Sequence, residues 1–262
     1  MRVILISANT EQINTPVLPL GMAKVAAATV QAGHDVRVIN PMRPEQVKEL
    51  LTETVLDFAP EIIGVSVRNI DDQDMNQPRF LLPAAREVIK ECRRISEAPV
   101  VLGGPGYSIF PGPALEYLGA DYGIVGEGER AFPVLLDRLA RRRPLPDIPG
   151  LVKPPGEVVR PPELILRLDE YPLAGPDILL KGLKKEGLKE LWIPFQTRRG
   201  CPMDCSYCST PAIEGRTPRK LSIEKVIDSL RAFTSSGCRR FFFVDNTFNL
   251  PRNTWSHYVT PS

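Results

Sequence analysis

The chain has 262 residues, of which 43% are hydrophobic and 24% charged, so it is long enough for one large globular domain or two ordinary ones. A formal net charge of +2 gives no electrostatic reason to expect a nucleic-acid or membrane partner. The N-terminus does not resemble a signal peptide, and no apolar run is long enough to span a bilayer, which predicts a cytoplasmic protein.

Short apolar runs alternate with helical patterns over residues 1–142. The runs predicted to be strands are Val3–Ile6, Val36–Ile39, Ile62–Val67, Val100–Leu102 and Tyr122–Val125. Apolar residues stand at successive positions in these runs, so both faces of the sheet should be covered. Helices are predicted over residues 22–30, 47–58, 80–95, 114–118 and 131–142. The alternation predicts an α/β fold with a five-stranded, doubly wound parallel sheet of strand order 2-1-3-4-5.

Residues 143–184 are rich in proline, and a segment with few amide donors is disfavoured inside a sheet. We therefore predict an extended linker there. Residues 185–262 then begin a second domain, with a strand at Leu191–Phe195, a helix at 223–233 after a capping Ser222, and a strand at Phe241–Val244. This β-loop-α-β unit indicates the start of a second parallel domain.

Three of the five cysteines, Cys201, Cys205 and Cys208, stand on the loop after the strand at Leu191–Phe195. Three close thiols suit a soft metal site, either iron-sulfur or zinc, in a reducing compartment. A fully ligated site needs a fourth protein ligand, and a zinc site completed by a distant His or Cys stays open as the alternative. Cys92 and Cys238 are predicted to be buried small hydrophobes.

In open parallel sheets, ligands bind outside the carboxyl ends of the strands. The candidate ligand loops of the first domain are therefore residues 8–20, 68–78, 103–111 and 126–129. Several glycines stand in these loops, and they would let a flat ligand approach the backbone. Each glycine loop alone is also what any doubly wound fold requires.

The Cys-x3-Cys-x2-Cys segment resembles the radical S-adenosylmethionine (SAM) superfamily. The resemblance implies that Cys201, Cys205 and Cys208 hold a 4Fe-4S cluster whose open iron is chelated by SAM. It also implies that Tyr207 lies beside the adenine. Asp245 and Asn246, at the end of the last predicted strand, would meet the bound SAM; the alternative is that they cap the next turn.

Residues 1–142 resemble the cobalamin-binding domain that precedes the radical domain in one branch of that superfamily. The resemblance rests on an early Pro-Leu-Gly, on Gly64-Val65-Ser66-Val67, on Gly-Gly-Pro and on Val-Gly-Glu-Gly-Glu. The resemblance implies that Ser66, Gly103 and Gly104 line the nucleotide tail or corrin edge, with Tyr107 at the rim and Arg68, Asn69 and Asp71 below the corrin. Gly126 and Glu127 are further residues expected to bind the cofactor. A solvated loop is the alternative for Arg68, Asn69 and Asp71.

Cobalamin mutases and methionine synthase supply an axial histidine from a motif after the first strand, whereas residues 9–21 of this chain contain no histidine. We read His34 and His257 as ordinary surface or structural residues. The resemblance therefore implies cobalamin without a histidine axial ligand.

The implied reaction is reductive cleavage of SAM, hydrogen abstraction by the adenosyl radical and methyl transfer from methylcobalamin to an unactivated carbon. The reductant would be a flavodoxin or ferredoxin, whereas the substrate, a small molecule or peptide, and the catalytic residues are not indicated. The rival hypotheses are a cobalamin-independent radical SAM enzyme and a noncatalytic cobalamin- or partner-binding module. Residues 185–262 have room for less than half of the superfamily's barrel. We therefore expect the present chain to be inactive alone and to self-associate through the incomplete barrel.

Overall fold

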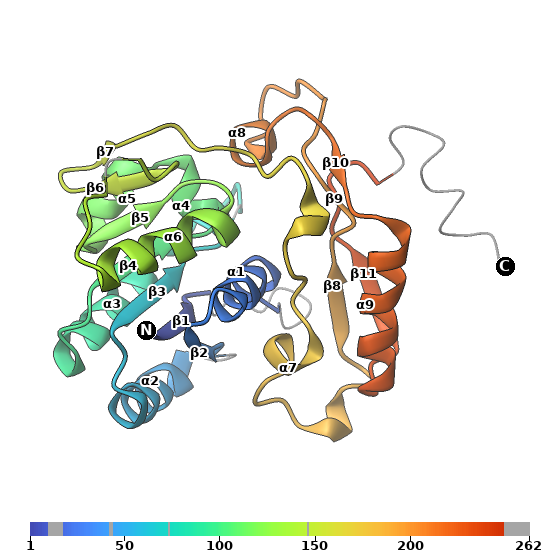
Figure 1. Cartoon of the computed structure of the whole chain (residues 1–262), viewed down its shortest axis with the longest axis horizontal. Coiled ribbons are helices and arrows are strands. Elements are labelled where there is room, and N and C mark those ends of the chain that lie inside the picture. The colour runs from blue at the N-terminus through green and yellow to red at the C-terminus, as the bar shows by residue number, and fades with distance from the viewer. Residues whose placement is uncertain (10–17, 42–43, 73, 146, 249–262) are drawn as a thin grey trace, which may run out of the picture. The chain divides into compact units, whose positions relative to one another are not determined.

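The computed structural model describes residues 1–9, 18–41, 44–72, 74–145 and 147–248 (Figure 1). The chain divides into two compact units, Met1–Glu163 and Leu164–Ser262, which are treated separately below. Within the described residues, no helix combines the length and the apolar character needed to cross a membrane.

The first unit contains the predicted parallel sheet. Its five parallel strands are β1 (Arg2–Ser7), β2 (Asp35–Ile39), β3 (Ile62–Ser66), β4 (Val100–Gly103) and β5 (Tyr122–Ile124). They pair in the order β2-β1-β3-β4-β5, which confirms the predicted doubly wound topology. The central strands β1 and β3 are buried along almost their whole length, as expected for a sheet covered on both faces.

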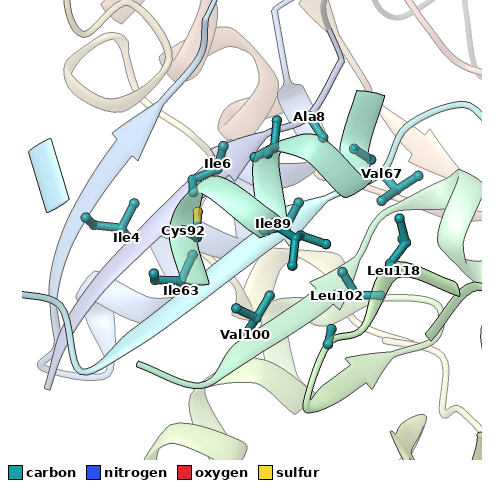
Figure 2. Packing of buried hydrophobic residues seen from close by; sticks show 14 of the residues in the cluster. Ile4, Ile6, Ala8, Ile63, Val67, Ile89, Cys92, Val100, Leu102 and Leu118 are labelled. Carbon is teal, nitrogen blue, oxygen red and sulfur yellow. The ribbon is translucent and has the colours of Figure 1, made fainter. Parts of the chain in front are cut away.

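The helices of this unit are α1 (Leu20–Gln31), α2 (Pro44–Phe58), α3 (Leu82–Ile95), α4 (Pro105–Ile109), α5 (Pro111–Leu118) and α6 (Gly128–Ala140). The main core lies between the sheet and the helices α2, α3 and α5, where Ile4 and Ile63 pack with Ile89 (Figure 2). On the opposite face, Gly64 leaves room for Leu5 and for Phe132 of α6. Only the five-residue helix α4 has no counterpart among the predicted helices.

The predicted linker is wrong for residues 151–158. The strand β6 (Leu151–Lys153) pairs antiparallel with β5, and β7 (Glu157–Val158) pairs antiparallel with β6, which extends the sheet to seven strands. Pro154 and Pro155 lie in the turn between β6 and β7, so the strands keep their amide donors. The first unit therefore extends to Glu163, and the later part of the predicted linker belongs to the second unit.

The second unit is built on one parallel pair, β8 (Trp192–Phe195) and β11 (Arg240–Phe243), connected through helix α9 (Ile223–Ser235). This is the predicted β-loop-α-β unit, and the Ser222 side chain accepts a hydrogen bond from the Lys225 amide at the start of α9. The remaining elements are the short helices η1 (Leu168–Glu170), α7 (Pro176–Leu179), η2 (Lys185–Gly187) and α8 (Thr210–Glu214), and the antiparallel pair β9 (Arg198–Arg199) and β10 (Arg219–Lys220). Ile165 and Leu168 pack on Phe195, so the second half of the predicted linker contributes to this core.

The place of β6 in the sheet generates a test. Leu151 is fully buried, so Leu151→Ala should lower the free energy of unfolding of the first unit by about 2–5 kcal/mol through lost burial and a cavity. The matched control is Leu166→Ala, because Leu166 came from the same predicted linker and is 74% exposed; its effect should stay within about 0.5 kcal/mol. Urea unfolding measures both, and equal small effects would mean that β6 is not part of the core.

Candidate functional site

The loops that leave the carboxyl ends of β3, β4 and β5 are joined by hydrogen bonds. The Val67 amide donates to the Gly103 carbonyl at 2.8 Å, and the Val67 carbonyl accepts from the Gly106 amide at 3.1 Å. The Ser108 hydroxyl donates to the Gly104 carbonyl at 2.9 Å and accepts from the Gly126 amide at 3.0 Å. We call residues 66–69, 103–108 and 126–127 the strand-end loops. They form one connected edge in the first unit.

The glycines of the strand-end loops differ in what surrounds them. At Gly104, where φ is 98°, a Cβ would stand 2.5 Å from the Val67 carbonyl oxygen; at Gly106 it would stand 2.9 Å from the Arg68 backbone. Both glycines are therefore explained by the close approach of two loops. A Cβ at Gly103 would meet nothing within 4 Å. Gly103 thus borders open space, where a ligand could approach the backbone.

The polar residues predicted near the cofactor stand on these loops. Ser66, Asn69 and Glu127 are half-buried, and Arg68 is exposed. Within the described part of the chain, Arg68 forms neither a hydrogen bond nor an ion pair, so its guanidinium is available to a ligand. Glu127 stands at the N-cap of α6, although its side chain does not cap the helix.

The loop after Arg68 is held by a residue that the sequence analysis did not identify. Asp72 accepts hydrogen bonds from the amides of Arg79 and Asp74, at 3.0 and 3.1 Å, and from Nε of Arg79 at 2.8 Å. These backbone and side-chain donors lower the pKa of Asp72 to about 2. Asp71 lies beside this closed loop and pairs with Phe80 through a backbone bridge. The signal in the sequence was the Asp-rich stretch, since Asp side chains often accept from amides two residues on.

Tyr107 was expected at the corrin rim, and this expectation is wrong. The side chain is fully buried in the core, because α4 turns it inward toward β5. A Cβ on Gly123 would stand 1.9 Å from the Tyr107 hydroxyl, so the ring occupies the space that this glycine leaves. Burial raises the pKa of Tyr107 above its usual range. Among the described residues, the hydroxyl has no hydrogen-bond partner.

The cysteine loop, residues 200–209, lies between β9 and α8 of the second unit. Its start is held tightly: the Cys201 amide donates to the Gly215 carbonyl at 3.1 Å, and a Cβ on Gly200 would stand 2.3 Å from the Thr217 carbonyl oxygen. Cys201 is accordingly buried, whereas Cys205 and Cys208 are exposed. The loop is therefore fixed at its first cysteine and open at the other two.

The chemistry of these thiols fits a metal site, although their arrangement is not closed. Hydrogen bonds from the Thr210 hydroxyl and amide lower the pKa of Cys208, which favours the thiolate that binds metal. In the described parts of the chain, no group of three or more His, Cys, Asp or Glu side chains is close enough to hold an ion. A metal bound by all three thiols would require Cys205 and Cys208 to turn toward Cys201. Tyr207 is 90% exposed between them.

The two remaining cysteines are structural, as predicted. Cys92 packs in the core of the first unit, and burial raises its pKa to about 12. Cys238 is fully buried, and desolvation raises its pKa as well. Neither belongs to a cluster of potential metal ligands in the described chain.

Asp245 and Asn246 follow β11, beside the end of β8. Asp245 Oδ1 accepts from the Thr197 and Arg198 amides, at 2.7 and 2.9 Å, and Oδ2 accepts from the Thr197 hydroxyl at 2.7 Å. Asp245 therefore caps the turn after β8, whereas the alternative considered from the sequence was a cap of the turn after its own strand. Asn246 is exposed and donates to Glu214 at 2.8 Å. Glu214 was not identified from the sequence, because its partners lie far from it along the chain.

His34 is a structural residue, as expected. His34 is buried, its Nδ1 lies 3.2 Å from the N-terminal amine, and burial lowers its pKa. It precedes β2, at the edge opposite the strand-end loops. His257 lies outside the described residues.

Comparison with known proteins agrees with both halves of this arrangement. Residues 6–136 match the family model of the B12 binding domain, and residues 195–258 match that of the Radical SAM superfamily. The chain is 31% identical to an uncharacterized methyltransferase of Pyrococcus horikoshii, over 95% of this chain and 54% of that protein. It is 32% identical to the hopanoid C-3 methylase of Methylococcus capsulatus, over 87% of this chain and 42% of that protein.

Among solved structures, the fold is similar to that of the radical SAM methyltransferase TsrM from Kitasatospora setae, described with tryptophan substrate and a SAM analogue bound. The TM-score is 0.82 at 27% identity, covering 95% of this chain and 48% of that one. The chain thus spans about half the length of the relatives that it matches.

The buried position of Tyr107 generates a test. Tyr107→Phe should raise the free energy of unfolding by about 1–3 kcal/mol, because it removes a buried hydroxyl without a partner. The control is Tyr117→Phe, since Tyr117 is 41% exposed, and its effect should stay within about 0.5 kcal/mol. Denaturant titration measures both. A loss of stability in Tyr107→Phe would mean that the hydroxyl has a partner in solution.

Proposed function

The chain belongs to the B12-binding radical SAM proteins, and from this membership we propose that it acts in a cobalamin-dependent methyl transfer to an unactivated carbon. The observation that carries the proposal is the cysteine loop, which follows a barrel-type strand in a chain that also contains a B12-binding sheet. A B12-binding sheet is not expected in a cobalamin-independent radical enzyme. Three clustered thiols are not expected in a noncatalytic binding module.

We propose that the strand-end loops hold cobalamin. Gly103 borders open space and could lie against the nucleotide tail or corrin edge, with Ser66, Gly104, Gly126 and Glu127 around it. Arg68 and Asn69, after β3, would face the lower side of the corrin, and the exposed guanidinium of Arg68, which has no partner among the described residues, supports this role. No histidine stands among these residues, so the cobalt would lack a histidine ligand.

We propose that the cysteine loop holds a 4Fe-4S cluster through Cys201, Cys205 and Cys208. Thiolates at three irons leave the fourth open for the amino and carboxylate groups of SAM. Exposed Tyr207 would lie beside the adenine, and Asn246, after β11, would meet the bound SAM. When bound, the cluster and SAM supply a hydrogen-abstracting adenosyl radical, and cobalamin supplies the methyl group.

The substrate is not indicated by the side chains of the described residues, and we assign no catalytic residue. The relatives named above act on different molecules, so their substrates do not transfer to this chain. A cluster of this kind needs an electron donor, for which we propose a flavodoxin or ferredoxin. Such a donor and the reduced thiols suit the cytoplasm.

The first test concerns the cluster. Anaerobic reconstitution with iron and sulfide should give a broad absorption at roughly 400 nm, typical of thiolate-ligated clusters. Cys201→Ser, Cys205→Ser and Cys208→Ser should each lose most of the iron, whereas Cys92→Ala, at a buried structural cysteine, should keep it. Tight binding of one zinc without iron incorporation would contradict the proposal.

The second test concerns cobalamin. The chain should bind cob(II)alamin, and paramagnetic resonance of the complex should lack the splitting that a protein nitrogen on cobalt produces. His34→Ala should leave this spectrum unchanged, because His34 lies at the opposite edge of the sheet. Protein-nitrogen splitting, or no binding at all, would overturn the cobalamin site.

The third test concerns turnover. Phe242, Phe243 and the following Val244 are 36–44% exposed in the described part of the chain, although Phe243 contacts Phe195 and Phe248. Among the described residues this apolar edge is therefore not covered as a sealed radical pocket requires. We expect slow, abortive formation of 5'-deoxyadenosine with a strong reductant, together with self-association in sedimentation experiments. Several turnovers coupled to a methylated product would instead mean that this chain is a complete enzyme.

A further inference from the structure

We propose that Glu214 is a positioning residue that holds the start of the cysteine loop and the strand-end residue Asn246 in one fixed arrangement. The inference rests on the proposed function, because it assigns the arrangement to a cluster and its bound SAM. The network itself belongs entirely to the second unit and can be tested without either group.

The carboxylate of Glu214 joins three segments of the chain. Oε2 accepts from the Gly200 amide at 3.1 Å and from Nδ2 of Asn246 at 2.8 Å. Oε1 accepts from Nε2 of Gln196 at 3.0 Å. Gly200 precedes the first cysteine, Gln196 follows β8, and Asn246 follows β11. One ionised side chain therefore connects the loop to the ends of both parallel strands.

The backbone of Glu214 is also held in place by its neighbours. Its main-chain carbonyl accepts from the guanidinium of Arg219, which is 4% exposed and also donates to the Ile165 carbonyl at 2.8 Å. The next residue, Gly215, has a φ of 78°, and a Cβ there would stand 2.3 Å from the Leu164 side chain. The backbone at Glu214 thus cannot shift far, and its carboxylate has a fixed anchor.

A carboxylate suits this position for a chemical reason. All three partners are N–H donors, and an ionised carboxylate accepts at both oxygens without presenting a donor of its own. Hydrogen bonds to a charged acceptor are also stronger than those between neutral groups. A shorter or apolar side chain would leave the Gly200 amide without its acceptor.

The Glu214 network would fix the distance between Cys201 and Asn246. Cys201 is placed by the segment that Glu214 fixes at Gly200, and Asn246 is placed by the same carboxylate. An iron held at Cys201 and a SAM group that meets Asn246 would therefore keep a constant separation, while Cys205 and Cys208 remain free to close on the metal. Glu214 would act through its neighbours and need not touch either group.

The experiment measures alkylation of each cysteine in the metal-free full chain by iodoacetamide, followed by mass spectrometry. Cys201 is buried and reacts only when the loop opens, whereas Cys205 and Cys208 are exposed already. Glu214→Ala should accelerate Cys201 alkylation by about tenfold or more, because several bonds to a charged acceptor are lost. Cys205 and Cys208 should change by less than about twofold, and so should all three in the control Glu186→Ala, at an exposed glutamate of the same unit.

Two further variants separate positioning from general stability. Asn246→Asp places a second carboxylate against Glu214 and should also accelerate Cys201 alkylation. Glu214→Gln keeps one side-chain oxygen for the Gly200 amide and for Nδ2 of Asn246, so this conservative variant should stay within about twofold of the wild-type rate. Buried Cys238 reports on the fold of the same unit and should stay unreactive in every variant.

If Glu214→Ala leaves the Cys201 rate unchanged, the proposal is wrong. If Glu214→Ala unfolds the unit, as reactive Cys238 would reveal, Asn246→Asp and Glu214→Gln decide. Acceleration in Asn246→Asp with a wild-type rate in Glu214→Gln supports the proposal, and an unchanged rate in Asn246→Asp overturns it. Iron content of the reconstituted wild type is measured in parallel. A wild type that takes up no iron would refute the proposed function while the alkylation result still stands or falls by itself.

Discussion

Parallel strands end together at one edge of their sheet, and the loops that leave this edge must satisfy their own backbone donors and acceptors. Each unit meets this constraint in its own way. In the first unit, the Val67 peptide and the Ser108 hydroxyl join the loops after β3, β4 and β5. In the second, Asp245 and Glu214 accept from the amides that follow β8. Rigid edges of this kind leave nearby side chains free to bind ligands.

The two edges present different groups. At the first, Gly103 borders open space and Arg68 carries a charge without a partner among the described residues, an arrangement suited to a large polar ligand. At the second, Cys201 is buried and held, while Cys205 and Cys208 are exposed. A loop fixed at one thiol and open at two can admit a cluster and then close around it.

The sequence predicted the parallel sheet because apolar runs alternate with helical patterns along the chain, and this alternation is visible in the order of the residues. The prediction failed where the outcome depends on the direction of a side chain or on contacts between residues far apart in the sequence. The high proline content of residues 143–184 predicted a linker. Pro154 and Pro155 instead occupy a turn, and β6 and β7 on either side of it were not predicted. The glycine-rich segment around Tyr107 does not indicate whether the short helix α4 turns the tyrosine ring toward the core or toward a ligand. Glu214 was missed because a contact such as that with Asn246 spans 32 residues of chain.

The central claim is that the cysteine loop supplies three ligands and leaves one iron for SAM. Electron-nuclear double resonance of the reduced cluster, with SAM labelled with 15N at the amino group or 17O at the carboxylate, tests this claim most directly. The account predicts a coupling from each label, because both groups would be bonded to the open iron. A cluster that shows no coupling from either label, with a fourth ligand from the protein, would contradict it.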